Sequence, residues 1–232
     1  MPFAARSPIA PLSDPLAPIA FDAYVRARLP LTRPATLPEI ALHLAQTSSS
    51  LSRCVATARD DALTPYWAYL WAGGAVLARH LLDRPHAVAG RRVLDLGAGS
   101  GVAAIAAALA GAAEVTAADI DPNAARAVAL NAIANGVRAS VILGDLTVGP
   151  PPDVDVVLVG DLFYAPALVT PVRDFLDRCV SAGIQALVGD PWRAPLPRDR
   201  LRLIAEYDAP DFGGGAHAVT TAAAVFAYEA SS

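Results

Sequence analysis

Two carboxylates and a run of glycines have the spacing that a nucleotide-type cofactor site requires. The apolar run Val-Leu-Asp-Leu at 93–96 is followed by glycine at every second position, Gly97, Gly99 and Gly101. A second apolar run ends in Asp119, about 20 residues after this loop. Glycines let a ligand approach the backbone closely, and a carboxylate that ends the next strand can accept hydrogen bonds from both ribose hydroxyls. The spacing predicts a strand, a glycine loop, a helix and a second strand that together bind a nucleoside-bearing cofactor.

The residues at positions 95 and 102 separate two classes of cofactor. The dinucleotide pattern G-x-G-x-x-G requires a third glycine where this chain has Val102. The pattern here is Asp-x-Gly-x-Gly-x-Gly, which begins at Asp95. A carboxylate a few Å from a pyrophosphate costs on the order of several kcal/mol in a partly buried site. S-adenosylmethionine (SAM) has no phosphate and carries a sulfonium and an ammonium, so the loop favours SAM over NAD.

Further polar and aromatic residues follow the later apolar runs. In an open parallel sheet the ligand lies off the carboxyl ends of the strands, near the point where the strand order reverses. Asp145 follows the third run and is placed to accept a hydrogen bond from an adenine amino group. Asp161, Phe163 and Tyr164 follow the fourth run and are expected to face the reacting group. A role as a turn or capping residue remains the alternative for each aspartate, Asp119 included.

An aromatic and glycine-rich segment precedes the glycine loop. Residues 66–82 are expected to form one helix that begins after a proline, and Trp67 and Trp71 would share a face of it. Aromatic residues at that spacing usually pack in a core, so Trp71 is either a core residue or a cofactor contact. Gly73 and Gly74 each cost a helix about 1 kcal/mol relative to alanine. Their presence favours a close backbone approach or a break near the ligand.

The elements that must position these residues alternate between strand and helix. Strands are expected at 92–96, 114–119, 139–144, 154–160, 184–189, 201–207 and 220–228, helices at 21–29, 100–110, 122–135 and 167–181, and either type at 38–45. This order predicts an α/β fold with a Rossmann-like, doubly wound, mostly parallel seven-stranded sheet and helices on both faces, with one antiparallel strand near the end. Residues 1–36 are expected to form a partly irregular extension, and residues 37–232 one domain with a helical cap to about residue 85.

Composition limits the functions that the chain can have. The 232 residues carry a net charge of −4 without a basic run, which argues against a nucleic-acid partner. All 18 basic residues are arginines, so no Walker or Schiff-base lysine exists. Cys54 and Cys179 lack metal-ligand spacing, so neither a metal site nor a disulfide is expected. No apolar run is long enough to span a membrane, no secretory signal is evident, and the expected location is the cytoplasm.

Several motifs together resemble those of one enzyme family. The matching segments are Pro65-Tyr66-Trp67-Ala68, Trp71 with Gly73-Gly74, Val93 to Gly101, Asp119-Ile120-Asp121-Pro122, Gly160-Asp161-Leu162-Phe163-Tyr164, Gly189-Asp190-Pro191, Pro38-Glu39-Ile40 and Thr220-Thr221. Over residues 37–228 the chain resembles the seven-stranded (class I) SAM-dependent methyltransferases. Within them it closely resembles the electron transfer flavoprotein beta-subunit lysine methyltransferase family and its bacterial relatives. Ala72 replaces the family's usual proline, and Trp192 precedes Arg193, so the fit of the acceptor could differ.

The resemblance implies transfer of a methyl group from SAM to the ε-amine of a lysine in the flavoprotein's beta subunit, with S-adenosylhomocysteine as the product. The implied catalytic residues are Asp161, Tyr164 and Phe163, and the implied cofactor-binding residues are Trp71, Asp95, Gly97, Ala98, Gly99, Gly101, Asp119, Ile120, Asp145, Leu146 and Gly160. Asp161 would attract the substrate ammonium, and the aromatic rings would shape a pocket for a cation. The chain is expected to act as a monomer with no metal, nucleic acid or membrane.

Other functions stay open on the sequence alone. A small-molecule, nicotinamide-like amine is the nearest rival acceptor, and another protein, such as a ribosomal protein, is a further one. The chain could also bind SAM without catalysis, although the intact Asp-Leu-Phe-Tyr at 161–164 argues against this. An NAD(P)-dependent oxidoreductase is disfavoured by Val102 and by the lack of lysine. An amino-methylating DNA enzyme is disfavoured because Asp-Leu-Phe-Tyr stands in place of Asn-Pro-Pro-Tyr.

Overall fold

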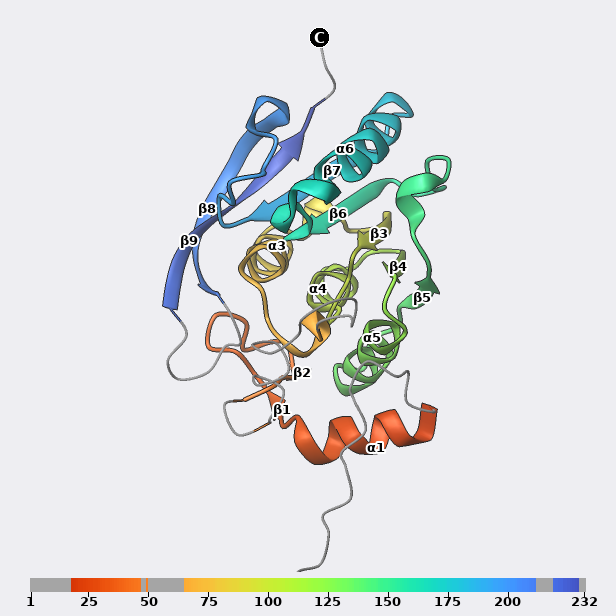
Figure 1. Ribbon diagram of the computed structural model, residues 1–232, viewed down its shortest axis with the longest axis vertical. Coiled ribbons are helices and arrows are strands. Elements are labelled where there is room, and N and C mark those ends of the chain that lie inside the picture. The colour runs from red at the N-terminus through yellow and green to blue at the C-terminus, as the bar shows by residue number, and fades with distance from the viewer. Residues whose placement is uncertain (1–17, 47–48, 50–64, 212–218, 230–232) are drawn as a thin grey trace, which may run out of the picture.

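A seven-stranded sheet forms the centre of the molecule (Figure 1). The structure is a computed structural model that describes residues 18–46, 49, 65–211 and 219–229. The strands are β3 (Arg92–Leu96), β4 (Glu114–Asp119), β5 (Ser140–Leu143), β6 (Val156–Gly160), β7 (Gln185–Asp190), β8 (Leu201–Asp211) and β9 (Val219–Tyr228). Their order is β5-β4-β3-β6-β7-β9-β8. The first five are parallel, and β9 runs antiparallel to both β7 and β8. The predicted fold class is confirmed.

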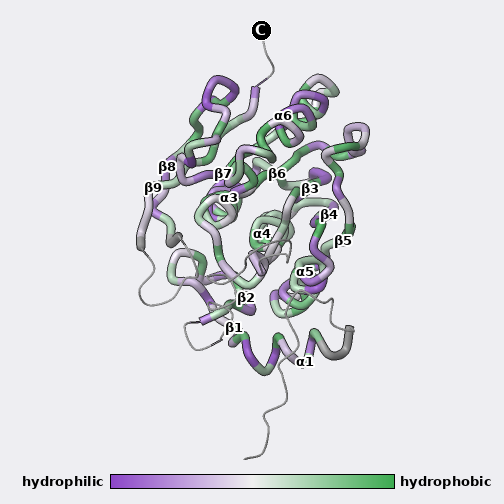
Figure 2. Tube along the Cα trace, viewed as in Figure 1, coloured by the Kyte–Doolittle hydropathy of each residue, from purple (hydrophilic) through white to green (hydrophobic). Residues whose placement is uncertain are grey.

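Helices cover both faces of this sheet. The longer helices are α1 (Pro18–Arg28), α3 (Ala72–Asp83), α4 (Val102–Leu109), α5 (Pro122–Ala134) and α6 (Pro166–Ser181). In β6, Val156 and Leu158 pack with α3 and α4, whereas Val157 and Val159 pack with α6 on the other face. Side chains of a strand alternate between its faces, so a strand buried on both sides is apolar throughout. Helix α4 is also apolar along its length, as Figure 2 shows.

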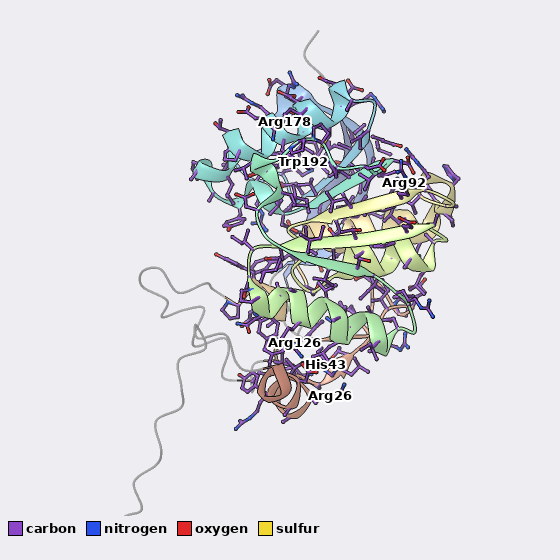
Figure 3. The ribbon with its side chains drawn as sticks, turned by 90° about the vertical axis from the view of Figure 1, so that its right-hand side faces the viewer. Arg26, His43, Arg92, Arg126, Arg178 and Trp192 are labelled. Atoms are coloured by element: carbon purple, nitrogen blue, oxygen red, sulfur yellow. The ribbon has the colours of Figure 1, made fainter. Side chains whose placement is uncertain are left out.

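The N-terminal elements pack beneath α5. Helix α1 is followed by a small antiparallel sheet of β1 (Leu31–Thr32) and β2 (Leu42–His43), so part of the ambiguous segment 38–45 is a short strand. Phe21 of α1 contacts Trp67, with ring centroids 5.1 Å apart. The Arg126 guanidinium of α5 reaches toward α1 and pairs with Asp22 at 2.7 Å (Figure 3). Residues from 18 onward within the expected extension are therefore packed on the sheet domain.

The helix expected over residues 66–82 is interrupted. A 3₁₀ turn, η1 (Tyr66–Ala68), is followed by extended residues, with φ −125° and ψ 155° at Tyr69 and φ −91° and ψ 149° at Trp71, before α3 begins. The prediction of a shared helical face was therefore wrong. Trp67 is buried against α1, Trp71 is less buried, and both border one cavity. The packing of η1 on one side and of α3 on the other fixes this break. The periodicity of apolar residues does not reveal it, because both segments are apolar.

Three backbones meet closely where α3 crosses the sheet. A Cβ added at Gly189 of β7 would overlap the carbonyl oxygen of Gly73 and lie 2.7 Å from the Leu77 side chain. A Cβ added at Gly160 of β6 would lie 3.0 Å from the backbone of Gly74. The expectation of a close backbone approach at Gly73-Gly74 is confirmed. These contacts bring the first turn of α3 to the carboxyl ends of β6 and β7.

Gly189→Ala is expected to destabilise the protein by about 1–3 kcal/mol, because neither backbone can retreat without moving a core helix. Urea unfolding measures this difference in the free energy of unfolding. Gly149→Ala is the matched control, since a Cβ there meets only ordinary contacts and the backbone has a negative φ. Equal stability of the two variants would show that the crossing tolerates a methyl group.

The C-terminal strand pair and the two cysteines differ in how far the structure describes them. Strand β8 extends four residues beyond the expected 201–207, to Asp211. Gly213–Gly215 and Cys54 lie outside the described residues, and Cys179 is buried in the α6 core. Among the described helices, none has the length and apolar character needed to cross a membrane.

Candidate active site

A cavity of about 440 Å³ opens at the carboxyl ends of β3, β4, β5 and β6. This is where the strand order reverses, and where ligands of open α/β sheets bind. Ten of the predicted site residues line it, namely Trp71, Gly97, Gly99, Asp119, Ile120, Asp145, Leu146, Gly160, Asp161 and Tyr164. The volume falls within the range of pockets that hold small ligands and cofactors. The structure therefore brings most of the predicted residues together around one space.

A larger depression of about 670 Å³ lies at the opposite edge of the sheet, at the amino ends of β3, β6 and β7. It is open and polar, and Arg92 pairs there with Asp153 at 2.6 Å and with Asp155 at 2.8 Å. No residue predicted to bind or react lies in it. Its position away from the carboxyl ends of the strands makes it a poor candidate for the site.

The glycine loop needs its glycines for backbone conformation and for packing. Gly97, Gly99 and Gly101 have positive φ angles of 68°, 52° and 79°, where side chains are disfavoured. A Cβ on Gly97 would lie 2.5 Å from Leu162, and one on Gly101 would lie 3.1 Å from Val128 of α5. Gly101 thus lies beneath the cavity, where it caps α4, whereas Gly97 and Gly99 line it.

The Asp119 carboxylate is fixed at the end of β4 by backbone donors. The Gly99 N–H donates to its Oδ2 and the Asp121 N–H to its Oδ1, each at 2.9 Å. Burial raises the pKa of Asp119, while the N–H groups of Asp121, Gly99 and Ile120 oppose that rise. Each carboxylate oxygen can accept more than one hydrogen bond. Asp119 lines the cavity, so it can still accept from a ligand there.

Asp95 lies under the loop rather than in the cavity, contrary to its expected contact with the cofactor. It is 3% exposed, and its Oδ2 accepts the N–H of Ala104 in the first turn of α4 at 2.9 Å. Burial raises the pKa of Asp95 to about 7, and the charge of Asp119 adds to the rise. Ala98 is also buried beside it and does not line the cavity. Asp95 therefore positions α4 and the loop from below.

Asp95→Asn is expected to gain stability relative to the native protein as the pH rises from about 4 to about 7. The folded state keeps the Asp95 proton up to about pH 7, whereas the group ionises near 3.8 when exposed. The raised pKa stabilises the folded native protein fully below about pH 3.8. This stabilisation falls as the pH rises and is gone above about pH 7. The asparagine cannot ionise, so the variant does not lose stability in this way. The difference between the two pKa values limits its relative gain to about 4 kcal/mol. Urea unfolding at several pH values measures it, and a pH-independent difference would contradict the assignment.

The third strand end supplies an aspartate with a structural partner of its own. Asp145 follows β5 and caps the 3₁₀ turn η3 (Leu146–Val148), where its Oδ1 accepts from the N–H of Thr147 at 2.9 Å. The Thr147 hydroxyl donates to the same oxygen at 2.6 Å. Asp145 also lines the cavity. The capping role and the ligand-facing position therefore coexist in this residue.

Aromatic side chains surround the other end of the cavity. Tyr66 lies 5.3 Å from Tyr164 and 5.5 Å from Trp71, measured between ring centroids. The Trp71 indole N–H donates to the Tyr66 carbonyl at 2.9 Å, which fixes the ring. Phe163, expected to face the reacting group, is instead fully buried in the α6 core. The 3₁₀ turn η4 (Leu162–Tyr164) points Phe163 inward and leaves Tyr164 half exposed at the cavity.

Asp161 is held at this end by Gly74 and Arg193. Its Oδ2 accepts the Gly74 N–H at 3.0 Å, and its Oδ1 accepts from the Arg193 guanidinium at 2.7 Å. Arg193 lines the cavity and was not among the predicted site residues. The available signal was its position just after β7, at the same edge of the sheet as the other strand-end residues. The site thus combines a carboxylate, a guanidinium and three aromatic rings.

Comparisons with known proteins agree with this geometry. Residues 77–189 match the family model of the ribosomal protein L11 methyltransferases (PrmA). The chain is 42% identical, over 71% of its length and 66% of the other's, to an electron transfer flavoprotein beta subunit lysine methyltransferase of Danio rerio. It is 34% identical to a homologue of that enzyme in Caenorhabditis elegans, over 68% of this chain and 71% of the other.

Solved structures bear on the fold. A candidate RNA methyltransferase of Pyrococcus horikoshii superposes with a TM-score of 0.54 at 15% identity, covering 78% of this chain and 98% of the other.

The chain spans 66% of the Danio rerio relative and 60% of the Rattus norvegicus one. With the similarity to the nematode protein, these findings show that the chain belongs to the electron transfer flavoprotein beta subunit lysine methyltransferase family.

Proposed function

We propose that the chain is a SAM-dependent N-methyltransferase whose acceptor is a lysine ε-amine of the electron transfer flavoprotein beta subunit. The observation that carries the proposal is one cavity with two chemically different ends. Asp119 and Asp145 follow β4 and β5 on one side of β3, and Asp161 and Tyr164 follow β6 on its other side. The named relatives supply the acceptor, since their printed names specify that subunit.

The lining of the cavity suits SAM. Within the described chain, its acidic residues are Asp119, Asp121, Asp145 and Asp161, against the single base Arg193. Such a lining favours a cationic ligand and disfavours a pyrophosphate. Asp119 would accept from the ribose hydroxyls, Asp145 from the adenine amino group, and the loop at Gly97 and Gly99 would let the ligand reach the backbone. SAM bound there would supply an electrophilic methyl carbon on its sulfonium, with the thioether of S-adenosylhomocysteine as the leaving group.

The aromatic end of the cavity suits an amine. The reacting nitrogen must lie about 3 Å from the methyl carbon with its lone pair free, so positioning dominates and little acid–base chemistry is needed at the carbon. Tyr66, Trp71 and Tyr164 line this end, and the faces of aromatic rings can hold an alkylamine and its cationic product. Asp161, anchored to the first turn of α3, fixes the position of this end relative to the glycine loop.

Labelled-methyl transfer into a lysate of the source cell, followed by mass spectrometry of the labelled species, tests the acceptor. Label on a lysine of the flavoprotein beta subunit supports the proposal. Label confined to small amines, or to another protein such as a ribosomal protein, contradicts the proposed acceptor while leaving methyl transfer intact. A protein that binds S-adenosylhomocysteine but transfers no label would be a binding module.

A further inference from the structure

The acceptor end of the cavity contains a guanidinium that a methyltransferase for amines would not obviously need. We propose that Arg193, paired with Asp161, makes the site reject the charged form of the acceptor, so that the lysine enters as the neutral amine and leaves its proton in water. This inference rests on the proposed function and adds to it a residue that sets the protonation state of the nucleophile.

The first support is the geometry of the ion pair. The Arg193 Nη2 lies 2.7 Å from Asp161 Oδ1, and the other carboxylate oxygen accepts the Gly74 N–H. Both side chains line the cavity, with exposed fractions of 23% for Arg193 and 11% for Asp161. The guanidinium is thus the more accessible partner. An entering ammonium meets a carboxylate whose charge is already compensated.

The second support is the backbone that presents the pair. Among the described residues, Asp161 and Trp192 are the non-glycine residues with positive φ, 56° and 63°. A non-glycine residue in this region is strained, and such strain persists where the surrounding structure holds it in place. One strained residue is a member of the pair, and the other directly precedes Arg193. Trp192 is held by Phe226, with ring centroids 4.8 Å apart. The fold therefore holds Arg193 against Asp161 from both sides.

The third support is a buried carboxyl behind the arginine. Asp190 is fully buried, and its Oδ1 accepts the backbone N–H of Arg193 at 2.6 Å. Its Oδ2 has no hydrogen-bond partner among the described residues. Burial raises the pKa of Asp190 to about 7. Asp190 thus fixes the backbone of Arg193 from behind the cavity wall.

The remaining titratable groups around the pair come from several elements. Tyr66 and Tyr164 are the phenols that line the cavity, and Asp119, Asp121 and Asp145 are its acids from the ends of β4 and β5. Burial raises the pKa of Tyr164, so its phenol stays neutral at physiological pH. A cation beside an amine favours the uncharged amine, because like charges repel in a partly buried site. As the lysine enters, one N–H bond of its ammonium breaks, the electron pair stays on nitrogen, and the proton passes to water.

Arg193→Met removes the charge and keeps a side chain of similar length. The maximal rate with the flavoprotein acceptor is measured at saturating SAM from about pH 6.5 to about pH 10. The acid limb of this profile, where the rate falls as the amine becomes protonated, is expected to shift to higher pH by about one to two units. The rate near pH 7.5 then falls by about 10- to 100-fold and returns to within about threefold of the native rate near pH 10. The KM does not rise at the lower pH, because the Asp161 carboxylate attracts the ammonium once the guanidinium is gone.

Two variants and one binding measurement serve as controls. Arg193→Lys keeps a cation and should keep the native limb. Arg198→Met removes a charge from the same segment, where Arg198 stacks over Trp192 at 5.5 Å, and should leave the limb unmoved. Calorimetry of acceptor binding in two buffers of different ionisation enthalpy should count about one released proton for the native protein and fewer for Arg193→Met.

Each result decides the inference. A rate that is equally low at every pH, with native affinity for S-adenosylhomocysteine, would assign Arg193 a purely structural role and overturn it. An unmoved acid limb, or unchanged proton release, would also overturn it. If the native protein transfers no methyl to the flavoprotein, the proposed function fails and this inference fails with it. A native enzyme that is active beside an unaltered Arg193→Met profile would contradict the inference alone.

Discussion

Asp119→Ala is expected to weaken the binding of S-adenosylhomocysteine by about 100-fold or more, measured by calorimetry. The carboxylate would accept hydrogen bonds from both ribose hydroxyls, and bonds to a charged acceptor contribute about 1.5–3 kcal/mol each. The same oxygens hold the N–H groups of Gly99 and Asp121 at 2.9 Å. The substitution therefore removes two ligand contacts and releases the loop that surrounds them. Turnover at saturating SAM should change much less than the affinity.

Glu114→Ala is the matched control for this variant. Glu114 begins the same strand, β4, and is exposed at the end away from the cavity. It should bind S-adenosylhomocysteine with native affinity. If Asp119→Ala also bound with native affinity while remaining folded, the cofactor would not lie at the end of β4, and the assignment of the two ends of the cavity would be wrong.

Asp161→Asn is expected to show the opposite pattern. The asparagine keeps the size of the side chain and an oxygen for the Gly74 N–H, but it loses the charge that holds Arg193. The released Arg193 guanidinium then stays charged at the acceptor end without its partner and displaces the amine, and errors of position of about 1 Å can cost about 100-fold in rate. The maximal rate should fall by about 100- to 1,000-fold, with affinity for S-adenosylhomocysteine within about threefold of native. Rapid-quench or steady-state methyl transfer measures the rate, and calorimetry the affinity.

Asp153→Asn controls for the loss of one carboxylate. Asp153 lies at the opposite edge of the sheet, where it forms an exposed pair with Arg92, and exposed pairs add little to stability. Its rate and thermal unfolding should match the native protein. A native rate for Asp161→Asn would exclude Asp161 from the acceptor site. A cooperative unfolding transition in that variant separates a lost function from a lost fold.

The central strands and the glycine loop could be predicted because local sequence and burial agree there. The runs at 92–96 and 114–119 are β3 and β4 with the expected bounds. The helix expected at 122–135 is α5, which Asp121 caps with its Oδ1 accepting the Asn123 N–H at 2.8 Å. Strands that are covered on both faces show continuous apolar runs, and loops with positive φ require glycine. Both signals belong to short stretches of sequence.

Contacts between distant segments decided what the sequence left open. The break at Tyr69–Trp71 depends on the packing of Trp67 against α1 and of α3 against β6 and β7. Phe163 and Tyr164 are adjacent aromatic residues, and only the sense of the η4 turn places one in the core and the other at the cavity. Arg193 gains its place through Asp161, which lies 32 residues earlier. The spacing of residues along the chain does not predict such long-range contacts.

Methyl transfer by the purified protein to the purified electron transfer flavoprotein, followed by peptide mass spectrometry of the beta subunit, tests the proposed function most directly. The native protein should add methyl groups to a lysine side chain, and the addition should fall sharply for Asp161→Asn and be restored for Asp119→Ala by raising the SAM concentration. Unmodified lysines in the beta subunit, with a protein that binds S-adenosylhomocysteine normally, would contradict the proposed acceptor.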